Sequence, residues 1–444
     1  MGRACPATRQ AGGVSRRTHL GLRPCLPGRG SMGAAESQRA RGNPRLSISG
    51  VGRGVEPPPC MAHMNGGALE HVRGLRIAHL IESDGPGGAE RMLANVATRL
   101  QAAGAWNLAI LPADGEGWLT RELVGTGVAI EYFRLDRPVS GKLARWLVAT
   151  LRRHQITVAH SHEFTMAVYG SWAARRARMG HVITMHGSRY YAHRLRRRLA
   201  LRLAVASSAW LVAVSQTLAS HLSRDLWIRH SRIRTIPNGV ALAAVERSSL
   251  RDELGLRPGH RLMLAVGNLY PVKGHGYLLD AFGILARRFP QLHLAIAGRG
   301  ELESALRARA EELGLGCRFH LLGLRSDIAN ILAAADLFVQ PSVSEGLPLA
   351  LLEAMMVRRP IVASAVGEIP IALADGAAGL LVKAADPPAL AAAVARLLTN
   401  VHEADQLAEA AGRRAAAEYA LPTMVERYAA LYAGEPRAEH DAHP

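Results

Sequence analysis

The sequence predicts an α/β protein built from two doubly wound, Rossmann-like domains that face each other across a cleft. A chain of 444 residues exceeds what one hydrophobic core usually holds, so two domains are expected. From residue 75 onward, short apolar runs alternate with helical patterns, which is typical of a parallel sheet covered by helices on both faces. The stretch 237–249, rich in turn and small residues, interrupts this alternation, which then starts again.

The first domain is expected to span residues 74–240. Helical patterns such as "AERMLANVATRLQAAG" and "GKLARWLVATLRRHQ" separate its apolar runs. These runs predict strands at 75–81, 107–111, 128–133, 156–160, 181–185, 210–214 and 233–236.

The second domain is expected to span residues 241–420. Its apolar runs predict strands at 261–267, 292–298, 317–323, 336–340, 360–365 and 379–382. A last helical pattern, "TMVERYAALYAG", stands apart from its neighbours. We expect this segment, 421–436, to be a helix that returns to the first domain.

Residues 1–73 form a tail rich in Arg, Gly and Pro without hydrophobic periodicity, which predicts disorder. Two readings of the tail stay open: an organelle transit segment, or a start at Met61 or Met64 with the preceding residues outside the protein. Eleven arginines against three glutamates in residues 1–74 supply +8 of the net charge of +18.

The basic charge does not predict a nucleic-acid partner. No aromatic-rich basic surface of the kind that stacks single-stranded bases accompanies it. Positive charge here suits phosphorylated small molecules or an anionic membrane surface. Because no apolar run reaches the length of a membrane span, and the four cysteines match no zinc or disulfide spacing, we expect a cytoplasmic protein, either free or peripheral at the inner face of the membrane.

Ligands of open parallel sheets bind at the carboxyl ends of the strands, so the turns that follow the strands are the places to search. In the first domain, "ESDGPGGAERML" places Gly87 and Gly88 before a helix, where backbone amides can hold an anion. "TMHGS" places His186 at the end of another strand, in hydrogen-bonding reach of a sugar hydroxyl or a developing charge. His160 and His162, in "AHSHEF", are equally well explained as packing residues.

The second domain carries a lysine in the corresponding turn. Within "AVGNLYPVKGHGYLLDAF", Lys273 follows Gly267 and Asn268 and precedes a helix. A lysine at such a position meets a phosphate as a point charge. A solvated surface lysine is the alternative.

The stretch "SVSEGLPLALLEAM" places two carboxylates on and before an apolar helix. Pro348 suits the first turn of a helix, which leaves the amides of Gly346 and Leu347 at the amino end to receive an anion. Glu353 lies about 7–8 Å into the helix at about 1.5 Å per residue, within reach of a ribose attached to that anion. Glu345 precedes the helix on a loop that faces the cleft. Pairing of Glu353 with a buried arginine or lysine is the alternative explanation.

These segments resemble the retaining GT-B glycosyltransferases, particularly family 4. The pair Glu345/Glu353 is similar to the E-x7-E signature of those enzymes. Other similar segments follow in the same order, namely "GGAERML", "TMHG", "VAVSQ", "IPNGV", "VGNLYPVKG", "IAGRGELESAL" and "DGAAGLLV". The resemblance spans about residues 75–434.

The resemblance implies a nucleotide-sugar donor bound mainly by the second domain and an acceptor bound by the first. It assigns the ribose hydroxyls to Glu353, the donor sugar to Glu345 and the diphosphate to Lys273. By the same resemblance, Gly87 and Gly88 approach that diphosphate, and His186 lies near the acceptor and the reacting carbon.

Three departures from the family pattern weaken parts of this assignment. Asn268 replaces a usual arginine, so one diphosphate cation is missing unless Arg299, next to Gly298, compensates. Glu368 and Ile371 replace a glycine and a glutamate of a common G-G-x-P-E segment. "NGV" also lacks an aspartate that often follows the asparagine–glycine.

We therefore expect a metal-independent, retaining glycosyltransferase, of the kind used in polysaccharide biosynthesis, with no cofactor besides its nucleotide-sugar co-substrate. The chain has no D-x-D triplet to hold a divalent metal on the diphosphate. The alternatives are a nucleotide-sugar 2-epimerase on the same fold, a non-catalytic nucleotide-sugar-binding protein, or a nicotinamide-dependent oxidoreductase, which no dinucleotide fingerprint supports.

The acceptor is expected to be a glycan, a lipid-linked sugar or a small molecule. The segment "YYAHRLRRRLALRLAVA" (190–206) is basic and amphipathic in helical register. It fits either contact with an anionic membrane that carries a lipid-linked acceptor, or a cleft-rim helix with solvated arginines.

Overall fold

The computed structural model describes residues 69–434, except 114–116, 136, 188–190, 193 and 242–247. The expectations for the tail therefore lie outside the described residues, except at its end. Val72, which the composition places in the tail, is fully buried and packs with Leu69 and Leu75 against the first domain. The folded part thus begins at least five residues earlier than predicted.

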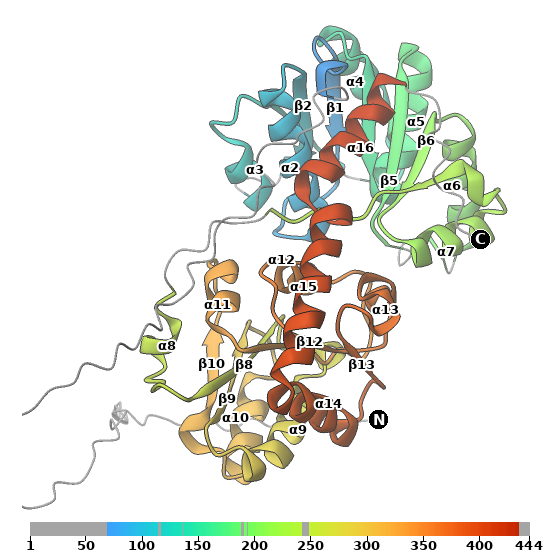
Figure 1. The fold of residues 1–444 in the computed structure, drawn as a ribbon. Coiled ribbons are helices and arrows are strands. Elements are labelled where there is room, and N and C mark those ends of the chain that lie inside the picture. Colours follow the sequence, from blue (N-terminus) through green and yellow to red (C-terminus); the bar gives the residue numbers. More distant parts are fainter. Residues whose placement is uncertain are drawn as a thin grey trace, which may run out of the picture. The chain divides into compact units, whose positions relative to one another are not determined.

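The first sheet has seven parallel strands in the order β3-β2-β1-β4-β5-β6-β7 (Figure 1). The strands are β1 Arg76–Leu80, β2 Trp106–Pro112, β3 Ala129–Phe133, β4 Val158–His162, β5 Gly180–Met185, β6 Trp210–Ala213 and β7 Ile233–Thr235. The strand order reverses between β1 and β4. This reversal marks the point where open α/β sheets bind ligands.

The second sheet repeats the pattern with six parallel strands in the order β10-β9-β8-β11-β12-β13. The strands are β8 Arg261–Val266, β9 Leu292–Ala297, β10 Phe319–Gly323, β11 Leu337–Gln340, β12 Ile361–Ser364 and β13 Leu380–Val382. The order reverses between β8 and β11. The predicted fold class, two doubly wound parallel-sheet domains, is confirmed.

Helices cover both faces of each sheet. In the first domain they are α2 Gly88–Ala102, α3 Trp118–Leu123, α4 Gly141–Arg153, α5 Glu163–Ala177, α6 Leu195–Ala206 and α7 Gln216–Leu226. After them come α8 Leu250–Glu253, α9 His275–Arg288, α10 Glu303–Glu312, α11 Ile328–Ala334, α12 Leu349–Met356, α13 Ile369–Ala372, α14 Pro387–Thr399, α15 Val401–Glu418 and α16 Leu421–Ala433. Short 3₁₀ turns are η2 His230–Arg232, η3 Pro271–Lys273, η4 Gly316–Arg318 and η5 Ala374–Gly376.

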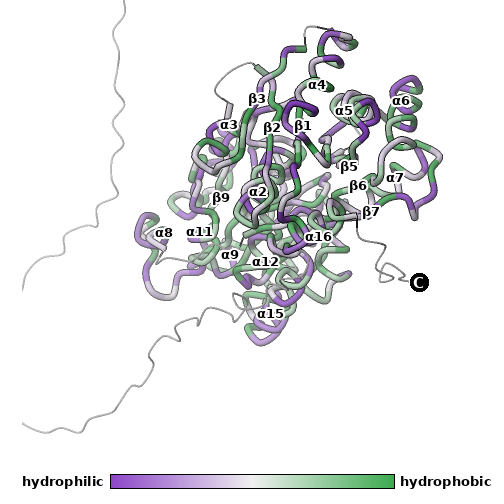
Figure 2. Tube along the Cα trace, turned by 90° about the horizontal axis from the view of Figure 1, so that it is seen from above, coloured by the Kyte–Doolittle hydropathy of each residue, from purple (hydrophilic) through white to green (hydrophobic). Residues whose placement is uncertain are grey.

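Alternate residues of the central strands enter different cores, which is why the strands read as continuous apolar runs. Leu262 and Leu264 of β8 pack in a cluster with Leu351 and Leu352 of α12. Met263, between them, packs in the other cluster, which contains residues of α9 and α14. Figure 2 shows hydrophobic and hydrophilic segments that alternate along the trace.

The last helix, α16, packs against the first domain beside α2 (Figure 1). Its Tyr428 and Tyr432 are buried, and the Tyr432 hydroxyl lies 2.6 Å from His160 Nδ1. The two segments that connect the domains run side by side, because Val240 N donates to Tyr419 O at 2.9 Å and Leu421 N donates to Val240 O at 2.9 Å.

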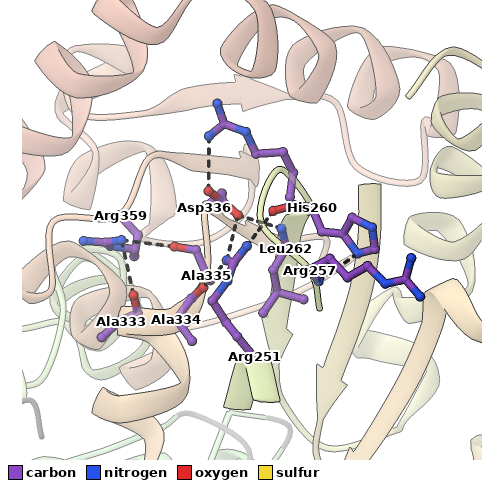
Figure 3. Close-up of polar contacts among 10 residues, drawn as sticks. Arg251, Arg257, His260, Leu262, Ala333, Ala334, Ala335, Asp336 and Arg359 are labelled. Carbon is purple, nitrogen blue, oxygen red and sulfur yellow. Dashed lines mark hydrogen bonds and ion pairs between the residues drawn. The ribbon is translucent and has the colours of Figure 1, made fainter. Parts of the chain in front are cut away.

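A charged network braces the second sheet at the start of β11 (Figure 3). Asp336 Oδ2 accepts from Leu262 N at 2.7 Å and from Arg251 Nη1 at 3.1 Å, and Arg261 Nη1 lies 3.1 Å from Asp336 Oδ1. Arg359 Nη1 donates to Ala335 O at 3.1 Å on the same side. This network lies at the end of the sheet opposite the carboxyl ends of its strands, so it serves stability.

One strand boundary differs from prediction in a way that matters for the site. β4 extends to His162, two residues beyond the predicted end, so both His160 and His162 lie inside the strand and are fully buried.

Among the described residues, no helix is both long and apolar enough to cross a membrane.

Candidate active site

Residues of both domains line one cavity of ≈ 260 Å³. Gly88 and Arg91 of α2 contribute from the first domain, and Glu353 of α12 contributes from the second. The connecting segment adds Asn238. Further walls come from Met92, Asn95, Gly239, Val240, Ala241, Ser326, Ile328, Ala329, Leu349, Met356 and Val357.

Among the described residues that line this cavity, Glu353 is the one with a carboxylate. It lies in the fifth position of α12, between the buried residues Leu352 and Ala354. Among the described residues, its side chain makes no hydrogen bond or ion pair, and the nearby Arg91 acts on it only through space. Burial raises the pKa of Glu353 to about 7, and Arg91 partly opposes that rise. An internal basic partner, the alternative explanation for this carboxylate, is therefore absent from the described part of the chain.

Lys273 and Glu345 form an ion pair at the reversal point of the second sheet. Lys273 Nζ lies 2.6 Å from Glu345 Oε1. The same oxygen accepts from Ser342 Oγ at 2.8 Å and from Gln340 Nε2 at 3.3 Å. The glutamate side chain is largely buried, whereas a quarter of the lysine side chain is exposed (9% and 25%). The loops after β8 and β11 are thus joined by a charge pair whose cation remains accessible.

Glycines allow the loops at this end of the second sheet to touch backbone to backbone. Gly274 has φ +70°, and a Cβ there would lie 2.0 Å from Pro341 O. Gly367 has φ +56°, and a Cβ there would lie 2.1 Å from Glu345 O. Gly298 leaves the same kind of space beside Gly267 O. Any side chain at these positions would push the loops that hold Lys273 and Glu345 apart.

The remaining donor residues of the second domain are not in the cavity wall and lie in the loops after its strands. Asn268, Arg299 and Gly346 are exposed at the ends of β8, β9 and β11, and Leu347 is half-buried. Pro348 is the N-cap of α12, which has no side-chain cap and no acidic residue in its first turn. No carboxylate of the first turn of α12 therefore neutralises its amino end.

The amino end of α2 differs in this respect. Gly87 is its N-cap, and the buried Glu90 stands in the first turn. The Glu90 carboxylate lies against Gly87, since a Cβ there would be 2.3 Å from Glu90 Oε2. Ser83 Oγ also donates to Glu90 Oε1 at 2.5 Å. Approach of Gly87 and Gly88 to a diphosphate stays a prediction, and the Glu90 charge opposes it.

His186 follows β5 in the first domain and contacts two residues of the neighbouring strand end. Its Nε2 lies 3.3 Å from His162 Nδ1, and its backbone N donates to Glu163 Oε1 at 3.1 Å. Burial lowers the pKa of His186 to about 4, so the imidazole is neutral near pH 7. His186 Nδ1 is buried without a hydrogen-bond partner.

Glu163 is the functional candidate that sequence reasoning missed. It begins α5 directly after β4 and adopts φ +65°, a left-handed conformation that non-glycine residues rarely hold without support. Burial raises its pKa to about 7, and the carboxylates of Glu82 and Glu90 raise it further, against the hydrogen bond from His186. The position of Glu163 at a strand end was the signal available in the sequence. Its raised pKa and its left-handed backbone conformation are visible only in the structure.

One cluster has the composition of a metal site. His79, His160 and His162 place ligand atoms within 4.8 Å of one another. His160, however, has both ring nitrogens engaged, by Tyr432 OH at 2.6 Å and Thr184 Oγ1 at 2.8 Å. At most two free imidazoles remain, fewer than the three or four ligands a zinc site takes from the protein. The cluster is better explained as the packing of α16 on the sheet.

A second feature missed from the sequence links the domains. Glu368, one of the departures from the family pattern, is buried and accepts a hydrogen bond from Thr217 N at 2.6 Å. Thr217 lies in the first turn of α7, so the carboxylate sits at a helix amino end, where negative charge is favoured. Glu368 N also donates to Gly346 O at 3.0 Å, which connects this contact to the loop that carries Glu345.

Comparison with protein families gives one match for each domain. The model described as glycosyl transferases group 1 matches residues 246–414, and that of glycosyltransferase family 4 matches residues 86–244. Together they cover more than two thirds of the chain.

Curated relatives match over shorter segments. The D-inositol 3-phosphate glycosyltransferase of Segniliparus rotundus is 33% identical over 203 residues, which are 44% of this chain and 45% of that protein. The UDP-Gal:alpha-D-GlcNAc-diphosphoundecaprenol alpha-1,3-galactosyltransferase of Escherichia coli is 31% identical over 235 residues, 49% of this chain and 60% of that protein. The matches thus span about half the length of these relatives.

Solved structures share the arrangement of both domains. A glycosyltransferase from Rickettsia africae superposes with a TM-score of 0.71 at 18% identity, over 81% of this chain and 97% of that one. The Anabaena protein HepE in complex with UDP superposes with a TM-score of 0.70 at 25% identity, over 81% of this chain and 100% of that one.

Proposed function

Because the chain belongs to the family 4 glycosyltransferases of the GT-B fold, we propose that it moves a sugar from a nucleotide-diphosphate sugar to a hydroxyl group. The transfer would retain the anomeric configuration and need no metal ion. The donor would bind the second domain, and the acceptor would bind the first.

The observation that carries this proposal is Glu353 in the wall of the shared cavity, a carboxylate that has no partner among the residues that the structure describes. A half-buried carboxylate without a partner loses part of its hydration and so costs folding free energy, and a ligand that donates hydrogen bonds to it is the physical reason to keep it. The two hydroxyls of a ribose can supply such donors. Ionisation of Glu353 on binding would then be favoured.

Lys273 is the cation best placed for the diphosphate. Its ammonium group already contacts one carboxylate, and a diphosphate with more than one negative charge would compete for it. Exchange of partners would release Glu345 to accept hydrogen bonds from donor-sugar hydroxyls. Lys273 and the uncapped amino end of α12 would then stabilise the charge that develops on the leaving diphosphate.

The first domain suits an acceptor that presents neutral hydroxyls. The carboxylates of Glu82 and Glu90 act on Glu163, which follows β4, and help to raise its pKa, so this strand end is already acidic. Such a place repels a phosphate but accepts hydrogen bonds from sugar hydroxyls. This favours a glycan or the sugar end of a lipid-linked acceptor, as in the name of the Escherichia coli relative, over an inositol phosphate.

Uracil is the first nucleotide base to test in the donor, because the names of HepE's complex and of the Escherichia coli relative both contain UDP. A lipid-linked acceptor would also bring the enzyme to the inner face of the membrane as a peripheral protein. This would place it in polysaccharide biosynthesis.

A thermal-shift screen against UDP-, GDP- and ADP-sugars tests donor binding, with Glu353→Gln as the paired variant. We expect one nucleotide series to raise the Tm of the wild type and to lose most of that effect in the variant. No shift with any series would contradict the proposal.

Incubation of the selected donor with polyprenyl-diphosphate-linked sugars, followed by mass spectrometry, tests transfer. The expected product is the acceptor plus one sugar, at an unchanged rate in EDTA. Interconversion of the free donor would instead identify a 2-epimerase, and binding without turnover would identify a non-catalytic protein.

A further inference from the structure

Helix α6 exposes a stripe of leucines. Leu195, Leu199 and Leu203 are 59%, 46% and 71% exposed. Their spacing of four residues puts them one above another on a single face of the helix. Single exposed leucines are ordinary, but three in register on a 12-residue helix form a continuous apolar strip.

Arginines border this strip. At about 100° per residue, Arg196 and Arg202 fall on its two sides, and both are exposed. Arg194, the exposed N-cap of α6, lies at its start. The helix itself contains no acidic residue. An apolar strip between cations is the pattern of a helix that lies in a membrane interface.

An exposed aromatic residue next to α7 lies beside the leucine strip of α6. Trp227, just after the carboxyl end of α7, is 52% exposed. Arg202 Nη1 donates to Leu226 O at 2.8 Å and to Trp227 O at 2.9 Å, and Arg198 lies 4.5 Å from the indole centroid. These arginines fix the indole next to α6. Arg198 and Arg202 therefore have structural roles, and among the described residues at the start of α6, Arg194 and Arg196 are exposed and can meet lipid.

We propose that the face formed by Leu195, Leu199, Leu203, Trp227, Arg194 and Arg196 (the α6 surface) docks onto an anionic lipid bilayer. Charge selects this occupant. A second copy of the same basic face would be repelled, and the Arg-rich first 68 residues of the chain carry the same sign of charge. A bilayer with anionic headgroups supplies both the negative charge and the apolar layer.

This inference rests on the proposed function for its purpose, because docking would present a lipid-linked acceptor. His186, at the end of β5, and Arg194 are eight residues apart. That length of chain spans at most about 27 Å, so the surface lies within reach of the acceptor side of the site.

Co-sedimentation of the full chain with phosphatidylcholine vesicles, with and without phosphatidylglycerol, tests the proposal. We expect binding only with phosphatidylglycerol, weakened by salt. The variant Leu195→Gln/Leu199→Gln/Leu203→Gln should lose binding by about tenfold or more, and so should Arg194→Glu/Arg196→Glu. Glutamine keeps helix propensity close to that of leucine, so the fold is preserved.

Matched controls are Leu324→Gln and Arg287→Glu, which change an exposed leucine and an exposed arginine of the second domain. Both should bind vesicles as the wild type does. Equal binding by all variants would overturn the proposal. A dimer in sedimentation velocity that the triple leucine variant abolishes would also overturn it, in favour of self-association. Since neither donor nor acceptor is present, the outcome is independent of whether the proposed transfer reaction is correct.

Discussion

The two sheets share one topology but end in opposite chemistry at the point where their strand order reverses. In the second domain, the accessible Lys273 and the uncapped amino end of α12 offer positive charge. In the first domain, Glu163 and the neutral His186 stand at the strand ends, and Glu90 occupies the amino end of α2.

This difference teaches that the side chains after the strands, and not the fold, assign the two substrates. A dianionic diphosphate is favoured where a cation and a helix amino end converge, and disfavoured beside the carboxylates of Glu82 and Glu90. The acceptor hydroxyl has the reverse preference. Each prediction below alters one side of this contrast.

Lys273→Met should have the largest effect. Loss of the cation that faces the leaving diphosphate should lower kcat by about 10²–10³, as for other groups that stabilise transition-state charge. The paired first-domain change, His186→Gln, removes a neutral hydrogen-bonding group and should cost about tenfold. Steady-state kinetics of both variants check this, and equal losses would remove the distinction between the two domains.

Glu163→Gln should alter the pH profile of the acceptor reaction. With a pKa of about 7, Glu163 is mostly a carboxylate above that pH and can then accept a hydrogen bond from the acceptor. At saturating donor, kcat/KM for the acceptor should rise through an ionisation near pH 7 in the wild type. The variant should lack that rise and be about tenfold slower at pH 8.

His186→Gln is the control for this profile. Because the pKa of His186 is about 4, the ionisation near pH 7 should persist in that variant. An inflection that survives in Glu163→Gln would assign it to another group.

Glu368→Ala should have a smaller effect, because it weakens a contact between the two domains. Loss of its bond to Thr217 N removes one contact that holds the domains together. We expect kcat to fall by about two- to tenfold, with nucleotide affinity nearly unchanged. Asp336 lies at the end of the sheet opposite the carboxyl ends of the strands. Asp336→Asn should therefore lower the free energy of unfolding by about 1–3 kcal/mol and leave kcat unchanged. A kcat loss in the control equal to that of Glu368→Ala would point to general destabilisation.

The last comparison concerns stability, where the expected effect has the same sign in both domains. Glu163 and Glu353 have folded-state pKa values of about 7, above the ordinary 4.5, so the folded state favours their protonated forms. Their burial costs little below about pH 4.5 and destabilises the fold increasingly as pH rises to 7.

Each single Gln variant should therefore be more stable than the wild type at pH 8, by on the order of 1–3 kcal/mol, and equal to it at pH 4. Urea unfolding at both pH values measures this. The exposed Glu301→Gln should change nothing at either pH.

Apolar alternation was enough to predict the two parallel sheets, because strands buried on both faces carry continuous Val, Ile and Leu runs. Glu353 was also predictable, since a carboxylate in an apolar helix stands out in one dimension. The end of β4 could not be predicted in this way, because His160 and His162 are polar residues that nevertheless lie in the core, where the tyrosines of α16 cover His160. That cover comes from a segment some 270 residues away.

Contacts between distant loops also escaped prediction. The family resemblance implied separate roles for Lys273 and Glu345, but their ion pair depends on how the loops after β8 and β11 pack. Glu368 looked like a loss from a family motif, whereas its partner, Thr217, lies in the other domain. Glu163 needed its φ angle and its neighbours before it could be singled out.

The central claim is that the Glu353 carboxylate receives ribose hydroxyls. Calorimetric titration of the selected nucleoside diphosphate and its 2′-deoxy and 3′-deoxy forms, into wild type and Glu353→Gln, tests it directly. We predict that a missing hydroxyl weakens binding to the wild type by about ten- to a hundredfold and leaves binding to the variant nearly unchanged. The same loss in both proteins would contradict the account.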